Sequence, residues 1–152
     1  MKKANAFIEC REKQGAWHGT SHAELERIKE SGKIPIIEVD YEGAIEINKQ
    51  ALEANFLFIY PPSFEELRKR IGNRIETEHE FKIRIKEAIS QIEKANKSVL
   101  FTNRLVNDDL EGAKSEVFTL IKALYFQEIE QISRQKAAEG DSMSGVEESK
   151  EE

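Results

Sequence analysis

The pattern of apolar and polar positions predicts strands that alternate with helices. Three short runs are rich in β-branched or aromatic residues, which is typical of buried strands. They are Ile34–Asp40, Asn55–Tyr60 and Phe101–Val106. Segments with helical spacing or helix caps lie around these runs, at about 21–31, 43–54, 63–71, 77–95 and 109–124. Strands that alternate with helices favour an α/β fold with a mainly parallel sheet.

Local signals predict where several of these elements begin. Capping sequences precede three helices: Ser21-His22-Ala23-Glu24, Ser63-Phe64-Glu65-Glu66, and Thr77 with Glu80. Either Asp108 or Asp109 is expected to cap the last helix. The two-glycine stretch 15–20 is predicted to form a compact loop that places Trp17 beside His18.

The first candidate site is a pair of acidic residues at the end of the first predicted strand. Glu38 and Asp40 are two residues apart, so on a strand they would share a face. Ligands bind at the carboxyl ends of strands in open α/β sheets, which makes this pair a candidate site. The alternative is that both residues end the strand and cap the next helix.

Composition narrows the class of protein. The 152 residues carry a net charge of −6, and residues 137–152 hold six acids and one Lys, or −5, which leaves −1 for the body. A near-neutral body gives no basic footprint for nucleic acid. We therefore expect one domain at 1–136 and a disordered acidic tail at 137–152.

Cysteine and hydropathy restrict the site and the compartment. Cys10 is the single cysteine, which excludes a disulfide framework and a cysteine-rich zinc site, and no metal-ligand cluster is predicted. No apolar run approaches the length of roughly 18 residues that a membrane span needs. The expected location is the cytoplasm.

A group of arginines flanks Gly72. Arg68, Arg70, Arg74 and Arg84 lie on or beside the two predicted helices there. The planar fork of arginine suits phosphate oxygens, so a mobile loop with several arginines could close over a polyphosphate. A solvated helix face is the alternative explanation.

Several motifs follow one another along the chain: Phe7-Ile8-Glu9; Gly15-Ala16-Trp17-His18-Gly19-Thr20; Glu38-Val39-Asp40-Tyr41-Glu42-Gly43-Ala44; Pro61-Pro62-Ser63-Phe64-Glu65-Glu66-Leu67; Arg70 and Arg74; Arg84; and Val106-Asn107-Asp108-Asp109-Leu110. With these motifs the chain from Phe7 to about Ile121 resembles guanylate kinase, which transfers a phosphoryl group from ATP to GMP. The spacing is nearly ungapped relative to that family, apart from about one missing residue in the loop after Arg74.

The resemblance implies a GMP site. Glu9 matches the acid that accepts hydrogen bonds from guanine, and Thr20 matches the hydroxyl that reaches guanine O6. An acceptor beside a hydroxyl would reject adenine. His18 stands where the family usually has a tyrosine that touches the GMP phosphate. Glu38 and Asp40 occupy the two acidic positions between guanine and the metal-phosphate side, without a decided division of roles.

The resemblance also implies a helical lid and a parallel sheet like that of P-loop NTPases. Arg70, Arg74 and Arg84 match the arginines that clamp the transferring phosphates. The sequence contains no G-x-x-x-x-G-K-[ST] motif, and Ile75 replaces a glycine after the lid arginine. We therefore expect an incomplete sheet without the P-loop strand and helix, with uncovered strand edges and apolar faces. ATP with Mg²⁺ is expected only if a further N-terminal segment exists, and the chain alone is expected to be inactive.

Three functions remain open at this point. The chain could be the GMP-binding and lid part of an active guanylate kinase. It could be a non-catalytic guanylate kinase-like scaffold module that binds a protein or phosphopeptide. It could also be a remnant that only packs against another chain.

Overall fold

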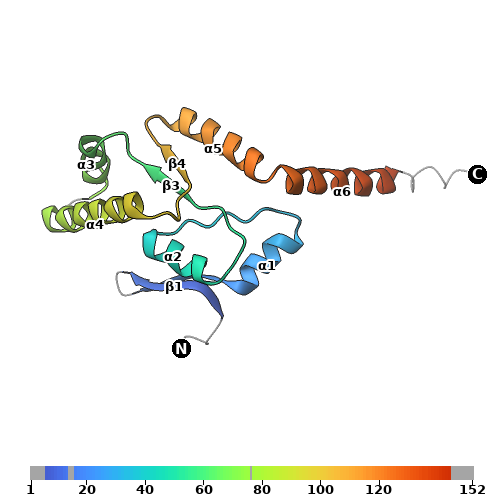
Figure 1. Ribbon diagram of the computed structural model, residues 1–152, viewed down its shortest axis with the longest axis horizontal. Helices are drawn as coiled ribbons and strands as arrows, with labels where there is room; N and C mark the ends of the chain where they lie inside the picture. The colour runs from blue at the N-terminus through green and yellow to red at the C-terminus, as the bar shows by residue number, and fades with distance from the viewer. Residues whose placement is uncertain (1–5, 14–15, 76, 145–152) are drawn as a thin grey trace, which may run out of the picture.

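The computed structural model describes residues 6–13, 16–75 and 77–144. The elements, in chain order (Figure 1), are β1 (Phe7–Lys13), β2 (Ala16–Ser21), α1 (His22–Glu30), α2 (Tyr41–Lys49), β3 (Leu57–Tyr60), α3 (Phe64–Gly72), α4 (Glu78–Lys97), β4 (Asn103–Val106), α5 (Leu110–Leu124) and α6 (Phe126–Ser144). Helices and short strands are mixed along the chain, which confirms the α/β class.

The parallel sheet is small. Strands β3 and β4 pair in parallel, with Leu57 opposite Asn103 and Tyr60 opposite Val106. The backbone N–H of Asn107 extends the pairing by donating to the Tyr60 carbonyl at 2.7 Å. Both strands were predicted, with their first residues two positions too early.

The prediction of a buried strand at 34–40 is wrong. This segment belongs to no strand, and Ile36 is 77% exposed. Ile37 and Val39 still pack against the core. An apolar, extended segment becomes a strand only when another strand pairs with it, and within the described residues β3 pairs with β4 alone.

The prediction of a loop at 15–20 is also wrong for the part that the structure describes. Ala16–Ser21 is strand β2, antiparallel to β1, with Glu9 opposite Thr20 and Arg11 opposite His18. The pairing runs to Lys13 opposite Ala16, while Gly15 lies outside the described residues. The hairpin forms a second sheet, separate from β3 and β4.

Side-chain caps start the helices as the sequence predicts. Ser21, Ser63 and Thr77 each accept a hydrogen bond from the backbone N–H three residues later. Asp109, rather than Asp108, does the same for α5. Asp40 caps α2, which therefore begins at Tyr41 and ends at Lys49, earlier at both ends than predicted.

Helix α2 joins two hydrophobic clusters. Its Ile47 packs with Ile8 of the hairpin and Leu25 of α1. Its Ala44 packs with Ala95 of α4 and with Phe101, which lies just before β4. The hairpin and the parallel sheet are thus connected through residues one turn apart on the buried side of one short helix.

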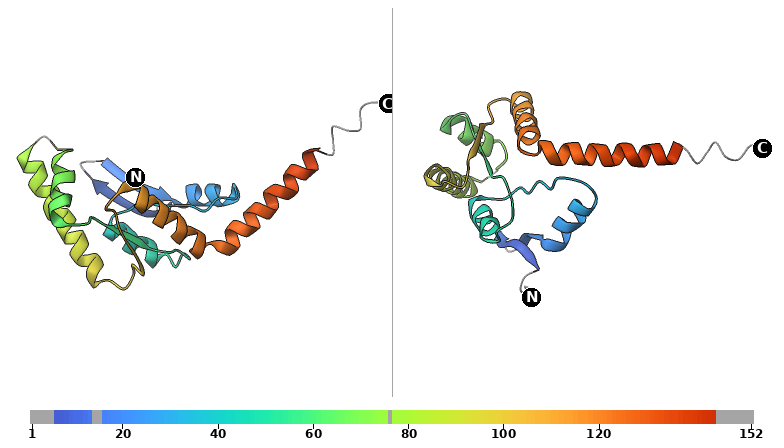
Figure 2. Two further views of the ribbon diagram at one scale, coloured as in Figure 1. Left: turned by 90° about the horizontal axis from the view of Figure 1, so that it is seen from above. Right: turned by 45° about the vertical axis from the view of Figure 1, so that its right-hand side comes forward.

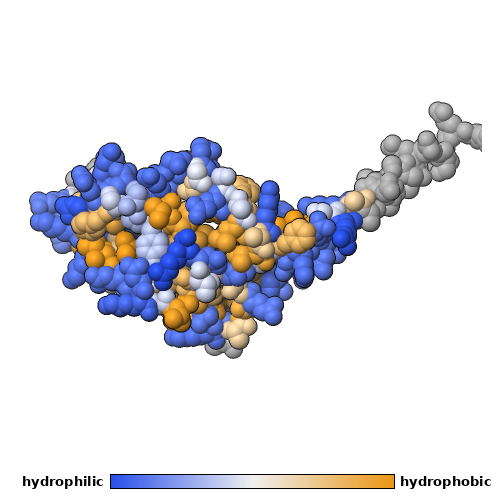
Figure 3. All heavy atoms as spheres, turned by 45° about the horizontal axis from the view of Figure 1, so that its top comes forward, coloured by the Kyte–Doolittle hydropathy of each residue, from blue (hydrophilic) through white to orange (hydrophobic). Residues whose placement is uncertain are grey.

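The surface retains large hydrophobic residues. Ile59 and Val106 of the parallel sheet are each about half exposed, and Phe118 on α5 is 65% exposed. Hydrophobic patches interrupt the hydrophilic surface in Figure 3. Helix α5 has no buried residue.

Helix α6 projects from the body in all three ribbon views (Figures 1 and 2). It runs to Ser144 and so includes 137–144, the first half of the stretch predicted to be a disordered tail. Residues 145–152 lie outside the described residues, and the division of the chain at 136 stays a prediction. In the described part of the chain no helix is long and apolar enough to cross a membrane.

We predict that Phe101→Ala lowers the free energy of unfolding by about 3–5 kcal/mol, because it empties a buried site. Phe101 is 5% exposed, and its ring contacts those of Tyr41, Phe56 and Phe58. Urea denaturation measures the change. Phe118→Ala is the matched control and should change stability by less than about 0.5 kcal/mol. Equal effects of the two substitutions would contradict the core described above.

Candidate functional site

Glu9 and Thr20 meet across the hairpin. The Thr20 hydroxyl donates a hydrogen bond to Glu9 Oε1 at 2.9 Å. Glu9 is 8% exposed and is the single buried charged residue among those that the structure describes. A buried carboxylate needs hydrogen-bond donors, and Thr20 supplies one. The hairpin therefore places an acid and a hydroxyl side by side, as the motif spacing suggested.

Gly19 permits this contact. A Cβ atom at Gly19 would lie 2.5 Å from the Glu9 carbonyl oxygen and 3.0 Å from Cys10 Cα. Both are backbone atoms, so any larger residue would force the two strands apart. The glycine before Thr20 therefore sets the close approach that lets the hydroxyl reach the carboxylate.

Asp40 connects the hairpin to α2. Its Oδ1 accepts a hydrogen bond from the Gly43 N–H at 2.9 Å, and its Oδ2 lies 3.8 Å from Arg11 Nε. Arg11 Nη1 lies 4.0 Å from Glu46 Oε1 on α2, and Glu46 Oε2 accepts from the Cys10 N–H at 3.4 Å. Asp40 therefore has the capping role that was the alternative to a ligand role, and it also faces the hairpin.

Two further predicted site residues are exposed. His18 lies on β2, two residues from Thr20 and opposite Arg11. Glu38 lies in the extended segment before Asp40. The side chain of Asp40 is only 12% exposed, so the two acids differ in their surroundings.

Arg70 is held by the protein itself. Its Nε donates to Glu66 at 2.8 Å, its Nη1 to the Asn107 carbonyl at 2.7 Å and its Nη2 to the Asp108 carbonyl at 2.9 Å. These carbonyls directly follow β4, so Arg70 fastens α3 to the carboxyl end of the parallel sheet. The hydrogen bond from Arg70 lowers the pKa of Glu66 below its ordinary value.

The other two lid arginines are less constrained. Arg74 follows α3 and is exposed. Arg84 on α4 lies 3.9 Å from Glu80 and 3.8 Å from Glu87, with a side chain that is 42% exposed. Figure 1 and the left view of Figure 2 place α3 and α4 on the side of the molecule where β1 ends and β2 begins.

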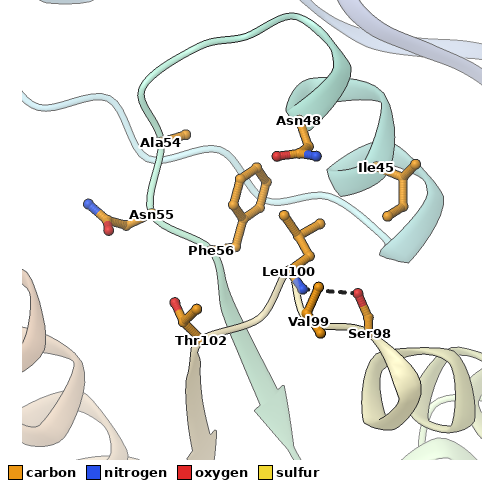
Figure 4. A pocket seen from close by; sticks show the side chains of 9 residues that line it. All are labelled: Ile45, Asn48, Ala54, Asn55, Phe56, Ser98, Val99, Leu100 and Thr102. Carbon is orange, nitrogen blue, oxygen red and sulfur yellow. Dashed lines mark hydrogen bonds between the residues drawn. The ribbon is translucent and has the colours of Figure 1, made fainter.

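A shallow hollow of about 500 Å³ lies elsewhere, at the amino ends of β3 and β4 (Figure 4). Its lining residues are Ile45, Asn48, Ala54, Asn55, Phe56, Ser98, Val99, Leu100 and Thr102. None of them is charged, and ligands of open α/β sheets bind at the opposite, carboxyl ends. The hairpin and the lid arginines are therefore the better candidate site.

Comparison with known proteins agrees with this geometry. The family model described as guanylate kinase matches residues 1–124. Guanylate kinase 1 of rice is 38% identical over 116 residues, which cover 76% of this chain and 30% of that protein. The chain belongs to the guanylate kinase family. Its small parallel sheet and surrounding helices are accordingly those of a guanylate kinase-like, P-loop-type fold.

Bacterial and other plant relatives give similar values. Guanylate kinase of Clostridium perfringens strain 13 is 34% identical over 118 residues, which cover 77% of this chain and 53% of that protein. Guanylate kinase 1 of Arabidopsis thaliana is 33% identical over 120 residues, covering 78% and 31%. The chain thus spans about half the length of the clostridial relative and about a third of the plant ones.

Sequence reasoning missed Arg11 and Glu46. Neither belongs to a motif that the resemblance uses, because Arg11 follows Glu9 inside β1 and Glu46 lies within α2. The available signal was the spacing of two residues between Glu9 and Arg11, which puts both on one face of a strand. This signal could not be used, because the sequence pattern did not predict β1 to be a strand.

We predict that Gly19→Ala destabilises the protein by about 1–3 kcal/mol, because the added methyl group overpacks the hairpin. Urea denaturation measures the loss, and the Thr20–Glu9 contact should weaken with it. The control is Gly72→Ala, where a Cβ would meet only the Phe81 ring edge at 3.5 Å. A stable Gly19→Ala protein would show that the close strand approach is not required.

The lowered pKa of Glu66 predicts a pH dependence. Glu66 contributes stability above its unfolded-state pKa, and this contribution is lost as pH falls through its lower folded-state pKa. Urea midpoints measured against pH should fall on acidification in the native protein. Glu66→Gln should remove that part of the fall, while the exposed neighbour Glu65 supplies the control Glu65→Gln. Identical profiles for Glu66→Gln and the native protein would contradict this role.

Proposed function

We propose that this chain forms the GMP-binding and lid part of a guanylate kinase, whose complete form converts ATP and GMP to ADP and GDP. The observation that carries the proposal is the hydrogen bond between the Thr20 hydroxyl and the nearly buried Glu9 carboxylate. Membership of the family and the position of both residues in its motifs support it.

The two side chains suit guanine. In the proposed complex the Glu9 carboxylate accepts hydrogen bonds from the ring N–H and the exocyclic amine of guanine, which replace the present donor. The Thr20 hydroxyl then turns its proton toward guanine O6. Adenine has an amino group in place of O6, so it cannot pair in this way. The site would reject adenine because its buried carboxylate would be left without donors.

The remaining predicted residues take supporting roles in this proposal. His18 lies beside the GMP phosphate, and Glu38 and Asp40 lie between the base and the phosphate side. Arg70, Arg74 and Arg84 stabilise the transferring phosphates electrostatically. Arg70 on α3, Arg74 just after α3 and Arg84 on α4 lie on one helical pair, which supports a lid role.

Phosphoryl transfer needs more than these residues. The 152 residues contain no G-x-x-x-x-G-K-[ST] motif, whose backbone N–H groups, lysine and hydroxyl hold the phosphates and Mg²⁺ of ATP. We therefore propose that this chain alone binds GMP without transferring phosphate. Mg²⁺ would enter on the phosphates of ATP, because Mg²⁺ is usually held by substrate phosphates together with one or two carboxylates. The proposed location is the cytoplasm, where a lone Cys10 stays reduced.

We predict that GMP binds the full chain and that Glu9→Gln weakens binding by roughly ten- to a hundredfold, because hydrogen bonds to a charged acceptor are lost. Thr20→Val should also weaken it while keeping the β-branched shape. Isothermal titration calorimetry measures both.

Glu12→Gln is the matched control, since Glu12 is an exposed acid on the same strand. AMP should bind none of these proteins appreciably. Absence of GMP binding to the native chain, with binding of a phosphopeptide instead, would overturn the proposal in favour of an interaction module.

A further inference from the structure

The hairpin continues the binding face beyond Glu9 and Thr20. The next pair on the same face of the ladder places Arg11 opposite His18. Residues two apart on a strand point to the same side, so these side chains lie on the face that carries Glu9 and Thr20. The hydrogen bond between Glu9 and Thr20 shows that side chains on this face meet across the strands.

Arg11 is only loosely engaged. Its guanidinium lies 3.8 Å from Asp40 and 4.0 Å from Glu46, and both distances exceed a hydrogen bond. A third of its side chain is exposed. By contrast, Arg70 and Arg104 each direct their guanidinium to backbone carbonyls through hydrogen bonds of 2.7–3.4 Å. Arg11 is therefore an arginine that can turn to a ligand without breaking a hydrogen bond to the described residues.

The two carboxylates beside Arg11 would not lose their other partners. Asp40 keeps its hydrogen bond from the Gly43 N–H at the N-terminus of α2, where the helix dipole also favours a negative charge. Glu46 keeps the Cys10 N–H. Movement of the guanidinium away from them therefore leaves no carboxylate without a donor.

We propose that Arg11 is a phosphate-binding residue for the nucleoside monophosphate whose base is held by Glu9 and Thr20. In the complex the guanidinium turns from Asp40 and Glu46 to two phosphate oxygens, for which its planar fork is suited. His18, directly opposite, supplies a second donor. This proposal rests on the proposed function and deepens it, because it names a residue for the phosphate of GMP, while Glu9 and Thr20 would hold only the base.

The test separates the phosphate from the base. GMP and guanosine are titrated at one ionic strength into the full native chain, Arg11→Gln and Arg27→Gln. Arg27 is the matched control because it is an exposed arginine paired only with Glu24 among the described residues. Arg11→Gln should lower GMP affinity by roughly ten- to a hundredfold and leave guanosine affinity unchanged. Arg27→Gln should change neither.

Each outcome has a separate meaning. An unchanged ratio of GMP to guanosine affinity in Arg11→Gln overturns the role of Arg11 while leaving the base site intact. Failure of both ligands to bind the native chain overturns the proposed function as well. Where melting shows that Arg11→Gln does not fold, Arg11→Lys replaces it. Lysine keeps the charge without the fork, so the ratio should fall severalfold, and an unchanged ratio would again count against the proposal.

Discussion

The carboxylate of Asp40 fixes where α2 begins, and α2 packs against both parts of the body. One oxygen caps α2 through Gly43, and the other faces Arg11 on the hairpin. The turn is tight, since a Cβ at Gly43 would lie 3.0 Å from Val39 Cβ. Because α2 then buries Ile47 toward the hairpin and Ala44 toward α4, the direction in which it leaves Asp40 sets both clusters. A change at this turn would therefore move the hairpin that carries Glu9 and Thr20 relative to the parallel sheet.

The hairpin illustrates how a candidate site can accommodate a buried acid without a ligand. Burial of Glu9 would be unfavourable for a charged carboxylate with no donor, and the Thr20 hydroxyl offsets part of that penalty. A hydroxyl can redirect the proton that it donates by rotation about the Cβ–Oγ1 bond alone. The two side chains thus satisfy each other without a ligand, and under the proposed function each would turn to guanine instead. Gly19 contributes to the site because it has no Cβ atom, which lets the two strands approach closely.

Local signals in the sequence were sufficient for some elements and not for others. Caps at Ser21, Ser63 and Thr77 depend on residues three positions away, so the sequence alone predicted them. The prediction of a strand at 34–40 was wrong, because a strand also needs a pairing partner, which no local pattern reveals. Strand β1 was missed for a different reason: its charged residues break the apolar alternation, and two of them, Glu9 and Arg11, form the candidate site.

Arginines that look alike in the sequence differ in what they can do. Each hydrogen bond of a guanidinium contributes roughly 1.5–3 kcal/mol when a charged group is involved, so Arg70 would have to give up three bonds to reach a phosphate in this conformation. Neither Arg74 nor Arg84 donates a hydrogen bond of this kind to the residues that the structure describes. Arg84 makes only two long ion pairs, with Glu80 and Glu87. In the proposed lid, Arg70 would be the fixed point at the carboxyl end of the sheet, and Arg74 and Arg84 would be the less constrained arginines. The number of arginines in the motif therefore does not fix how many would bind phosphate, because the backbone carbonyls after β4 already hold the guanidinium of Arg70.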